Sequence, residues 1–518
     1  MNQRSRDKHK PKPGAGQGHL KAVSSPQPPP KIDINAGIQD LPTISQLAWN
    51  ALEAANHPPT LFQFGGSVCR IQRDSGGILL LKRLNQHEFR HHLARSAHWC
   101  RMDQHGNVED ARPPDAVCQD MLASPHYPLP VVMRIVEAPV YADDGTVVTG
   151  AGYHPRSLTY FDKASNLQLD QVPQHPTAAD VKRARELILD DLLSDFPFVS
   201  ESDRAHLLAL LLLPFVRNLI DGPTPLHLIE SPVPGSGKGL AATVALIPAI
   251  GRDVTIIPPA TSGEETRKRL TAALSEGVSV ILLDNYRTML DSAELAAALT
   301  ARVWKDRILG RTEMVTLPIR CAWVCTANNP VLSTEIARRS IRIRIDPINE
   351  RPWQRDQFRH PDLAAWAIDH RSELIWAVLI MVNEWLALGK PLSKCKRLGS
   401  FERWSDIIGG ILGAVAIPGF LDNQNLLYEA ADLEGAAFKI FVEEWWDEFQ
   451  DRKVSVSELF PVAEGLDSFE LPGPNEQARR IFLGKEIARH RDRVFGNWRI
   501  MSAGTYRRAV VWKLNRVV

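Results

Sequence analysis

The sequence predicts an α/β protein whose main domain is a parallel sheet flanked by helices. Three apolar runs support this prediction, because none of them alternates with polar residues, as expected for strands buried on both faces. They lie in Leu228–Gly239, Val278–Asn285 and Cys321–Pro330, and each is followed by glycine-rich or polar residues. Ligand-binding residues of such sheets lie at the carboxyl ends of the strands, so these three ends are expected to carry the functional residues.

The first run leads into a glycine-rich turn that indicates a cradle for phosphate. The turn and the start of the next helix consist of Pro234, Gly235, Ser236, Gly237, Lys238 and Gly239. In such a turn backbone N–H groups converge on phosphate oxygens, the helix directs its positive end at them, and the lysine reaches the outer phosphates. The motif alone also fits an ordinary strand–turn–helix corner.

This turn departs from the pattern G-x-x-x-x-G-K-[ST] at two positions. Pro232 stands where the pattern has glycine, and Gly239 stands where it has a hydroxyl that holds Mg²⁺. Without the hydroxyl, Mg²⁺ would depend on water, phosphate oxygens and a downstream carboxylate.

The other two runs end in a carboxylate and in amides. Asp284 lies at the end of the second run and is expected to face the magnesium ion. At the end of the third run, Asn328 is the first candidate and Asn329 the second for sensing a terminal phosphate or orienting water. Downstream, Arg339 or Arg338 could complete the site of a neighbouring subunit, where a cation stabilises charge on a transferred phosphoryl group.

Together these segments resemble the AAA+ ATPase core, and more narrowly the superfamily 3-like helicase ATPases of phage, plasmid and integrated-element replication proteins. The resemblance covers most of residues 223–410 and is of the primase-helicase type, without a recognisable primase domain. It is carried by Pro234–Gly239, Leu283–Asn285, Asp306–Gly310, Thr326–Pro330, Arg338–Arg339 and Phe401–Trp404. It implies ATP and Mg²⁺ as ligands and a ring of subunits, expected to be a hexamer.

The resemblance also implies three local features. A β-hairpin before the amide-bearing strand would project into the pore of the ring, and here Trp304–Gly310 and Glu313–Arg320 could form its strands. Lys305, Arg307 and Arg311 would then contact DNA phosphates, although a surface hairpin with solvated charges is the alternative. Arg403, near the start of a helix in the expected lid, could reach the nucleotide or could be a surface arginine.

One departure from the resemblance concerns hydrolysis. Many AAA+ enzymes follow the strand's aspartate with a glutamate that activates water, but this chain has Asn285, whose amide cannot accept a proton. Glu264 and Glu265 are candidates for the missing acid. Slow hydrolysis, with ATP bound as a switch, is the alternative.

Composition fits a multidomain globular protein. The chain has 518 residues, 44% of them apolar, and its six cysteines show no paired C-x-x-C spacing. The N-terminus has no apolar core of a signal peptide, so we expect a cytoplasmic protein with no membrane contact. The expected parts are a disordered tail (1–40), a mixed α/β domain (41–177), a helical linker (178–222), the ATPase core (223–350), a helical lid (351–450) and a basic winged helix (451–518).

The C-terminal part has an uneven charge. Residues 475–518 contain eleven Lys or Arg and three Asp or Glu. Two helical patterns followed by two strands predict a winged helix, which could bind DNA phosphates or could be only a protein contact. The candidate DNA-binding residues on its second helix are Arg479, Arg480, Lys485 and Arg489.

The sequence therefore predicts a ring-forming, ATP-dependent DNA helicase or translocase that replicates a mobile genetic element. Its partner would be DNA, single-stranded or forked, with a separate primase as a further possible partner. An ATP-binding, DNA-associated initiator or regulator that hydrolyses little ATP is the alternative. A protein-remodelling ATPase, independent of nucleic acid, is a third class.

Overall fold

The computed structural model describes residues 29–34, 40–164, 167–252, 254–260, 262–286, 289–307, 314–347, 349, 351–506 and 509–517. The chain forms two compact units, which we describe separately. The small unit comprises Met1–His57 and Leu84–Pro128, and the large unit comprises Pro58–Arg83 and Leu129–Val518. Residues 41–177, expected as one domain, are thus divided between the two.

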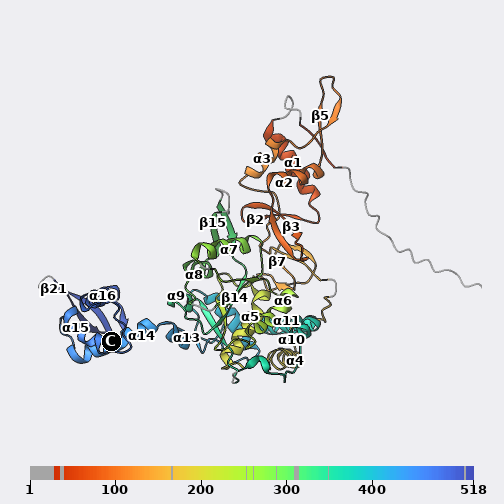
Figure 1. Ribbon diagram of the computed structural model, residues 1–518. Helices are drawn as coiled ribbons and strands as arrows, with labels where there is room; N and C mark the ends of the chain where they lie inside the picture. Colours follow the sequence, from red (N-terminus) through yellow and green to blue (C-terminus); the bar gives the residue numbers. More distant parts are fainter. Residues whose placement is uncertain are drawn as a thin grey trace, which may run out of the picture. The chain divides into compact units, whose positions relative to one another are not determined.

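A five-stranded parallel sheet lies at the centre of the large unit (Figure 1). Its strands, in spatial order, are β13 (Ile256–Ile257), β14 (Val280–Tyr286), β17 (Ala322–Asn328), β12 (Leu226–Ser231) and β18 (Ser340–Arg344). All four pairings are parallel. The predicted fold class is confirmed, and the three apolar runs of the sequence are three adjacent strands of this sheet.

Helices cover both faces of the sheet, and their apolar side chains are buried against it. One group consists of α5 (Glu201–Val216), α6 (Lys238–Ile250), α11 (Arg371–Ala387) and α12 (Glu402–Ala414), which share one hydrophobic core with Ile229, Val324 and Ile343 of the sheet. A second core joins α7 (Gly263–Ser275) and α8 (Ala293–Thr300) to Leu228, Leu283 and Trp323. The strands alternate between these two cores, as expected for a sheet buried on both faces.

Further helices precede and follow the sheet, as the sequence predicted. α4 (Ala178–Glu186) continues into a π-helical turn, η1 (Leu187–Leu192), before α5. After β18 come η2 (Pro352–Gln354), α10 (Leu363–Asp369), α13 (Gln424–Ala431) and α14 (Leu433–Phe449). Among the described residues no helix combines the length and the apolar composition that a bilayer span requires.

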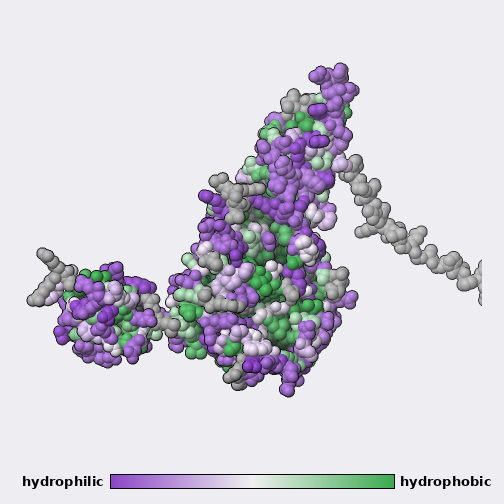
Figure 2. All heavy atoms as spheres, viewed as in Figure 1, coloured by the Kyte–Doolittle hydropathy of each residue, from purple (hydrophilic) through white to green (hydrophobic). Residues whose placement is uncertain are grey.

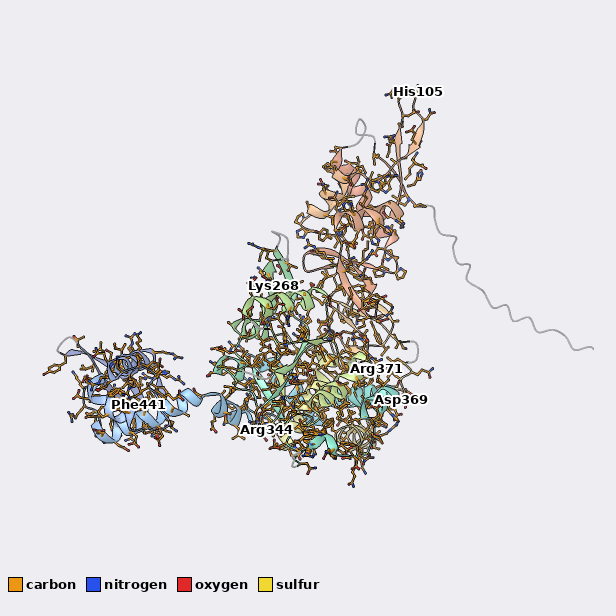
Figure 3. The ribbon with its side chains drawn as sticks, in the orientation of Figure 1. His105, Lys268, Arg344, Asp369, Arg371 and Phe441 are labelled. Atoms are coloured by element: carbon orange, nitrogen blue, oxygen red, sulfur yellow. The ribbon has the colours of Figure 1, made fainter. Side chains whose placement is uncertain are left out.

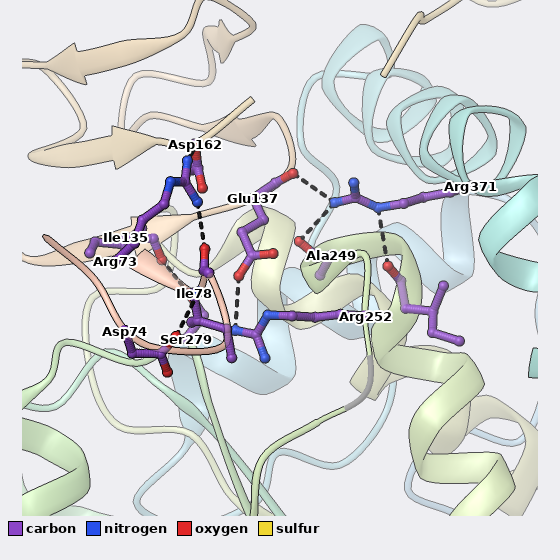
Figure 4. A network of polar contacts seen from close by, with 12 residues as sticks. Arg73, Asp74, Ile78, Ile135, Glu137, Asp162, Ala249, Arg252, Ser279 and Arg371 are labelled. Atoms are coloured by element: carbon purple, nitrogen blue, oxygen red, sulfur yellow. Dashed lines mark hydrogen bonds and ion pairs between the residues drawn. The ribbon is translucent and has the colours of Figure 1, made fainter. Parts of the chain in front are cut away.

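The buried side chain of Arg371, the first residue of α11, links this helix to the C-terminal end of α6 and to Glu137, a residue upstream of α4. Arg371 is buried and donates hydrogen bonds to the carbonyls of Ile247 (3.3 Å), Pro248 (3.2 Å) and Glu137 (2.6 Å) (Figure 4). Cations are favourable at a helix C-terminus, where carbonyls lack partners. The space is so tight that a Cβ at Gly251 would lie 2.5 Å from the guanidinium carbon.

Short sheets flank the main sheet within the large unit; two are antiparallel, and the third is mixed, because β11 pairs in parallel with β7. One contains β2 (Leu61–Phe64), β3 (Ser67–Arg73) and β4 (Leu79–Arg83); the others contain β7 (Arg134–Val136), β8 (Val140–Tyr141), β9 (Val147–Val148), β10 (Gly152–His154) and β11 (Thr159–Phe161). The backbone N–H of Leu81 donates to the carbonyl of Glu276, at the end of α7. Phe62, Phe64 and Leu81 are buried in the second core, which covers the main sheet.

The small unit combines α1 (Leu41–Ala55), α2 (Gln86–Ser96) and α3 (Asp115–Ala123) with a three-stranded sheet. The sheet consists of β1 (Lys31–Asp33), β5 (His98–Met102) and β6 (Val108–Asp110), and His105 lies at the tip of the β5–β6 hairpin (Figure 3). The expectation of disorder for residues 1–40 is wrong for Lys31–Asp33, because this segment pairs with β5. Residues 1–28 and 35–39 lie outside the described residues.

The C-terminal module contains two helices and a hairpin, in the order expected of a winged helix. It consists of β19 (Val454–Ser455), α15 (Val456–Glu464), α16 (Glu476–Arg489), β20 (Val494–Phe495), β21 (Trp498–Tyr506) and β22 (Ala509–Arg516). Phe441 of α14 is buried in its core (Figure 3). In the view of Figure 2 its surface is mainly hydrophilic.

Candidate nucleotide site

The glycine-rich turn after β12 has the backbone that a phosphate cradle needs. Gly235 has φ of 73° and Gly237 has φ of 92°, conformations that side chains other than glycine rarely adopt. Gly237 is the N-cap of α6, and no side chain caps this end of the helix. The first N–H groups of α6 are therefore available to an anion placed in the turn.

Lys238 lies folded into this turn. Its side chain is buried, and its ammonium donates to the carbonyl of Val233 (3.2 Å) and the hydroxyl of Ser236 (3.0 Å). Burial lowers the pKa of Lys238, while the charge of Asp284 acts in the opposite direction. The two residues are thus electrostatically coupled although they are distant in the sequence.

Asp284 is held in place by a threonine of the neighbouring strand. The hydroxyl of Thr326 donates to a carboxylate oxygen of Asp284 at 2.5 Å and accepts from the backbone N–H of Asn285 at 2.8 Å. Asn285 has φ of 60°, and the register of β14 against β17 shifts at this point. Asparagine adopts this left-handed conformation more readily than most residues. The backbone conformation therefore accounts for an asparagine at position 285.

Asn328 lies between the phosphate turn and Asp284, because β17 is inserted between β12 and β14. It pairs in register with Ser231, the last residue of β12. Its side-chain oxygen is buried and has no hydrogen-bond partner among the described residues. A buried polar atom without a partner is costly, so this oxygen is suited to a ligand or water. Asn329 is exposed, with φ of 40°, and donates its N–H to the carbonyl of Ser231 (3.2 Å).

A cavity of about 250 Å³ opens beside the phosphate turn. Its aromatic lining comes from Phe196, before β12, and from Trp353 and Phe358, after β18. Trp353 also packs on the turn, since a Cβ at Gly235 would lie 3.2 Å from its ring. The sequence analysis missed these residues, because they are far from the glycine motif and follow no pattern of their own.

The candidate arginines have different surroundings. Arg338 is exposed directly after α9 (Thr334–Ala337). Arg339 is half-buried and forms an ion pair with Glu335, so it is already engaged within its own chain. Arg403 is exposed on the first turn of α12.

The candidate acids lie on the first turn of α7. Glu264 pairs with Lys268 (2.8 Å) and Glu265 with Arg269 (3.0 Å), each one helical turn along. Lys268 lies on this helix in Figure 3. The hydrogen bond from Lys268 holds the pKa of Glu264 below its usual value. Both carboxylates are thus in surface ion pairs, and no contact of theirs with the phosphate turn is seen among the described residues.

The predicted hairpin is present as β15 (Val303–Arg307) and β16 (Met314–Pro318). Lys305 and Arg307 are exposed, while Trp304 and Asp306 alternate with them and are buried. Thr271 of α7 anchors the hairpin: its hydroxyl donates to Asp306 (2.5 Å) and accepts from the indole of Trp304 (2.8 Å). Residues 308–313, including Arg311, lie outside the described residues.

Three of the four candidates on α16 form ion pairs within the chain. Arg479 pairs with Glu464 (2.8 Å), Arg480 with Glu476 (2.5 Å) and Arg489 with Glu486 (3.3 Å). Lys485 is exposed. These ion pairs neutralise part of the positive charge along the helix.

Neither a family model nor a curated protein matches the chain. Solved structures with some similarity include "SCCmec type IV Cch - active helicase", with a TM-score of 0.36, 11% identity and coverage of 88% of this chain and 97% of that one. Another is the helicase of JCV, with a TM-score of 0.20, 13% identity and coverage of 51% and 70%. Because both TM-scores are below 0.5, the assignment of the candidate nucleotide site depends on the geometry of this chain alone.

Proposed function

We propose that the chain is an ATP-dependent DNA helicase or translocase that works as a ring, expected to be a hexamer, in the replication of a mobile genetic element. The observation that carries this proposal is the convergence of Lys238, Asp284 and Asn328 at the carboxyl ends of three adjacent strands, beside a glycine turn with an uncapped helix. Such an arrangement suits a nucleoside triphosphate.

The residues present fit ATP and Mg²⁺. The turn and Lys238 would hold the phosphates, the aromatic cavity would hold the base, and Asp284, oriented by Thr326, would hold the metal. The described residues contain no group of three carboxylate, histidine or cysteine side chains that could hold a metal ion by themselves. One carboxylate plus the phosphates of the nucleotide is a common arrangement for Mg²⁺, which when bound neutralises charge on the phosphates.

Two exposed cations on the anchored hairpin support the DNA part of the proposal. Lys305 and Arg307 are free to contact phosphates, while Trp304 and Asp306 fix the hairpin to α7. In a ring, Arg338 is the better placed of the two candidate arginine fingers, since Arg339 is paired with Glu335. Lys485 could add a DNA contact from the C-terminal module, and a separate primase would be a further partner.

The test of this function is steady-state ATP hydrolysis by the full chain with and without single-stranded DNA. Stimulation by DNA supports the motor. The alternative, a DNA-associated switch, predicts tight ATP binding with little hydrolysis. It is favoured by the ion pairs that engage Glu264 and Glu265 on α7 and by Asn285 in place of glutamate. Hydrolysis that is indifferent to DNA would contradict both and would favour a protein-remodelling ATPase.

Replacing Thr326 by valine should lower the rate of ATP hydrolysis about tenfold, because a hydrogen bond to a charged group contributes about 1.5–3 kcal/mol. Valine keeps the shape of threonine but cannot hold Asp284 or accept from Asn285. The rate is measured at saturating ATP, with Thr326→Ser as the matched control that keeps the hydroxyl. Equal rates for the valine and serine variants would contradict the positioning role.

Replacing Gly239 by serine should lower the Mg²⁺ concentration needed for half-maximal hydrolysis. A Cβ at this position meets no atom within 4 Å, so the hydroxyl that the phosphate motif usually carries has room. Gly413, a helical glycine with equally open surroundings on α12, gives the control Gly413→Ser. A Mg²⁺ titration of hydrolysis decides, and an unchanged midpoint in Gly239→Ser would show that the metal lies elsewhere.

Replacing Trp353 by alanine should weaken ATP binding about tenfold, because stacking of a base on an aromatic ring contributes about 1–3 kcal/mol. Calorimetry with ATP measures the loss. Inorganic tripolyphosphate, which lacks a base, is the matched ligand and should bind both proteins equally. Equal losses for the two ligands would mean that Trp353 acts through the phosphate turn on which it packs.

A further inference from the structure

Arg134 in β7 is a buried cation without a partner. Its side chain is almost completely buried, at 1% exposure. None of its three guanidinium nitrogens has a hydrogen-bond partner among the described residues. Only its backbone is engaged, through the pairing of β7 with β11. A buried charge of this kind is strongly unfavourable unless something neutralises it.

The surroundings of Arg134 add positive charge. The charged or ionisable groups that act on it are Arg217, Arg320 and the thiol of Cys321. Arg217 is itself buried, and its guanidinium donates hydrogen bonds to the carbonyls of Ile220, Gly222 and Ile319. Burial raises the pKa of the Cys321 thiol to about 12, so the thiol is neutral at physiological pH.

No described carboxylate compensates this charge. Asp221 acts on Arg217 and Arg320, and it forms an ion pair with Arg302 at 2.6 Å. Burial lowers the pKa of Arg134 only to about 9, which leaves the guanidinium charged at neutral pH. The charges of two buried guanidinium groups, Arg134 and Arg217, therefore repel each other in a low-dielectric environment.

A small cavity adjoins Arg134. Its volume is about 10 Å³, and its lining includes Arg134, Phe215 of α5, Ala249 of α6 and Ser279 before β14. Ser279 does not use its hydroxyl on the arginine, because it donates to the carbonyl of Ile135 at 2.7 Å (Figure 4). This space admits one small particle, a water molecule or a monatomic ion, and a polyatomic anion such as phosphate is too large for it.

We propose that a monatomic anion, chloride under ordinary conditions, binds in this cavity as the counter-ion of Arg134. Water could accept a hydrogen bond from the guanidinium but would leave its charge uncompensated. A halide ion both accepts the hydrogen bond and neutralises the charge. The bound ion links β7 to α5 and α6, and so fastens the flanking strands to the helices behind the phosphate turn. This site is independent of the proposed ATPase activity.

The test compares thermal unfolding of the full chain in sodium chloride and in sodium gluconate at equal ionic strength. The unfolding midpoint should rise with chloride concentration and stay nearly constant in gluconate, because a ligand that binds only the folded state stabilises it by mass action. Arg134→Met should remove the difference between the two salts. Arg156→Met, at an exposed arginine paired with Asp144, should retain it.

A crystal grown in sodium bromide provides a second measurement, which does not depend on whether Arg134→Met folds. Anomalous scattering should place one bromide beside the guanidinium of Arg134. Unfolding midpoints of the unmodified chain that are equal in both salts, or a peak at this position without anomalous signal, would overturn the proposal and leave water as the occupant.

Discussion

Replacing Lys238 by alanine should reduce ATP hydrolysis by about a hundredfold or more, the loss seen when one preorganised group that stabilises transition-state charge is removed. The ammonium is already positioned in the turn by Val233 and Ser236 and is coupled to Asp284, so its removal takes away a charge that no described neighbour replaces. Affinity for ATP should also fall. Hydrolysis assays and calorimetry measure the two effects.

This variant should remain as stable as the unmodified protein. Lys238 is a buried cation, and burial of its charge costs free energy that alanine does not incur. An unchanged or higher unfolding midpoint would therefore separate lost chemistry from lost folding. Lys439→Ala, which removes an exposed lysine paired with Glu443 on α14, is the control and should leave hydrolysis unchanged. Hydrolysis by Lys238→Ala at the unmodified rate would contradict the assignment of the site.

Replacing both Lys305 and Arg307 by alanine should abolish DNA unwinding and leave ATP binding intact. Both side chains are exposed on β15, and the buried residues that anchor the hairpin are untouched, so the hairpin should keep its place on α7. Each lost phosphate contact should lower the slope of log affinity against log salt by about 0.7 for single-stranded DNA. A strand-separation assay and salt titrations of DNA binding measure these effects.

A matched double variant tests whether the effect belongs to the hairpin. Lys182→Ala with Arg204→Ala removes an exposed cation from α4 and a partly exposed one from α5, with the same change of net charge. It should unwind DNA normally. Normal unwinding by the hairpin variant would contradict the motor and favour the ATP-dependent switch. From the sequence, Arg311 is expected to add a third contact.

The parts of the site that lie within one local segment could be predicted from the sequence. Lys238 and Asp284 belong to motifs in which a strand, a turn and a side chain occur together, and the fold predicted from these strands is the one observed. Thr326 could not be predicted, because its role exists only once β14 and β17 are neighbours. The same holds for Phe196, which precedes β12, and Trp353, which follows β18.

Asn285 shows a different limit of sequence reasoning. In the sequence it stands where a glutamate was expected, and it therefore raised the question of hydrolysis. In the structure it also occupies a left-handed backbone position at a register shift, which favours asparagine for conformational reasons. The residue type at one position can thus be favoured by the backbone conformation or by the chemistry of the site, and the sequence alone does not distinguish these two causes.

The path of the chain between the two units determines how the protein can be cut into working fragments. The chain leaves the small unit after His57, forms β2, β3 and β4 in the large unit, and returns at Leu84. A truncation that begins after Pro128 would therefore remove Phe62, Phe64 and Leu81 from the second core of the main sheet. Such a fragment would expose apolar surface and tend to aggregate. A usable fragment must retain Pro58–Arg83, joined to Leu129 by a short linker in place of Leu84–Pro128.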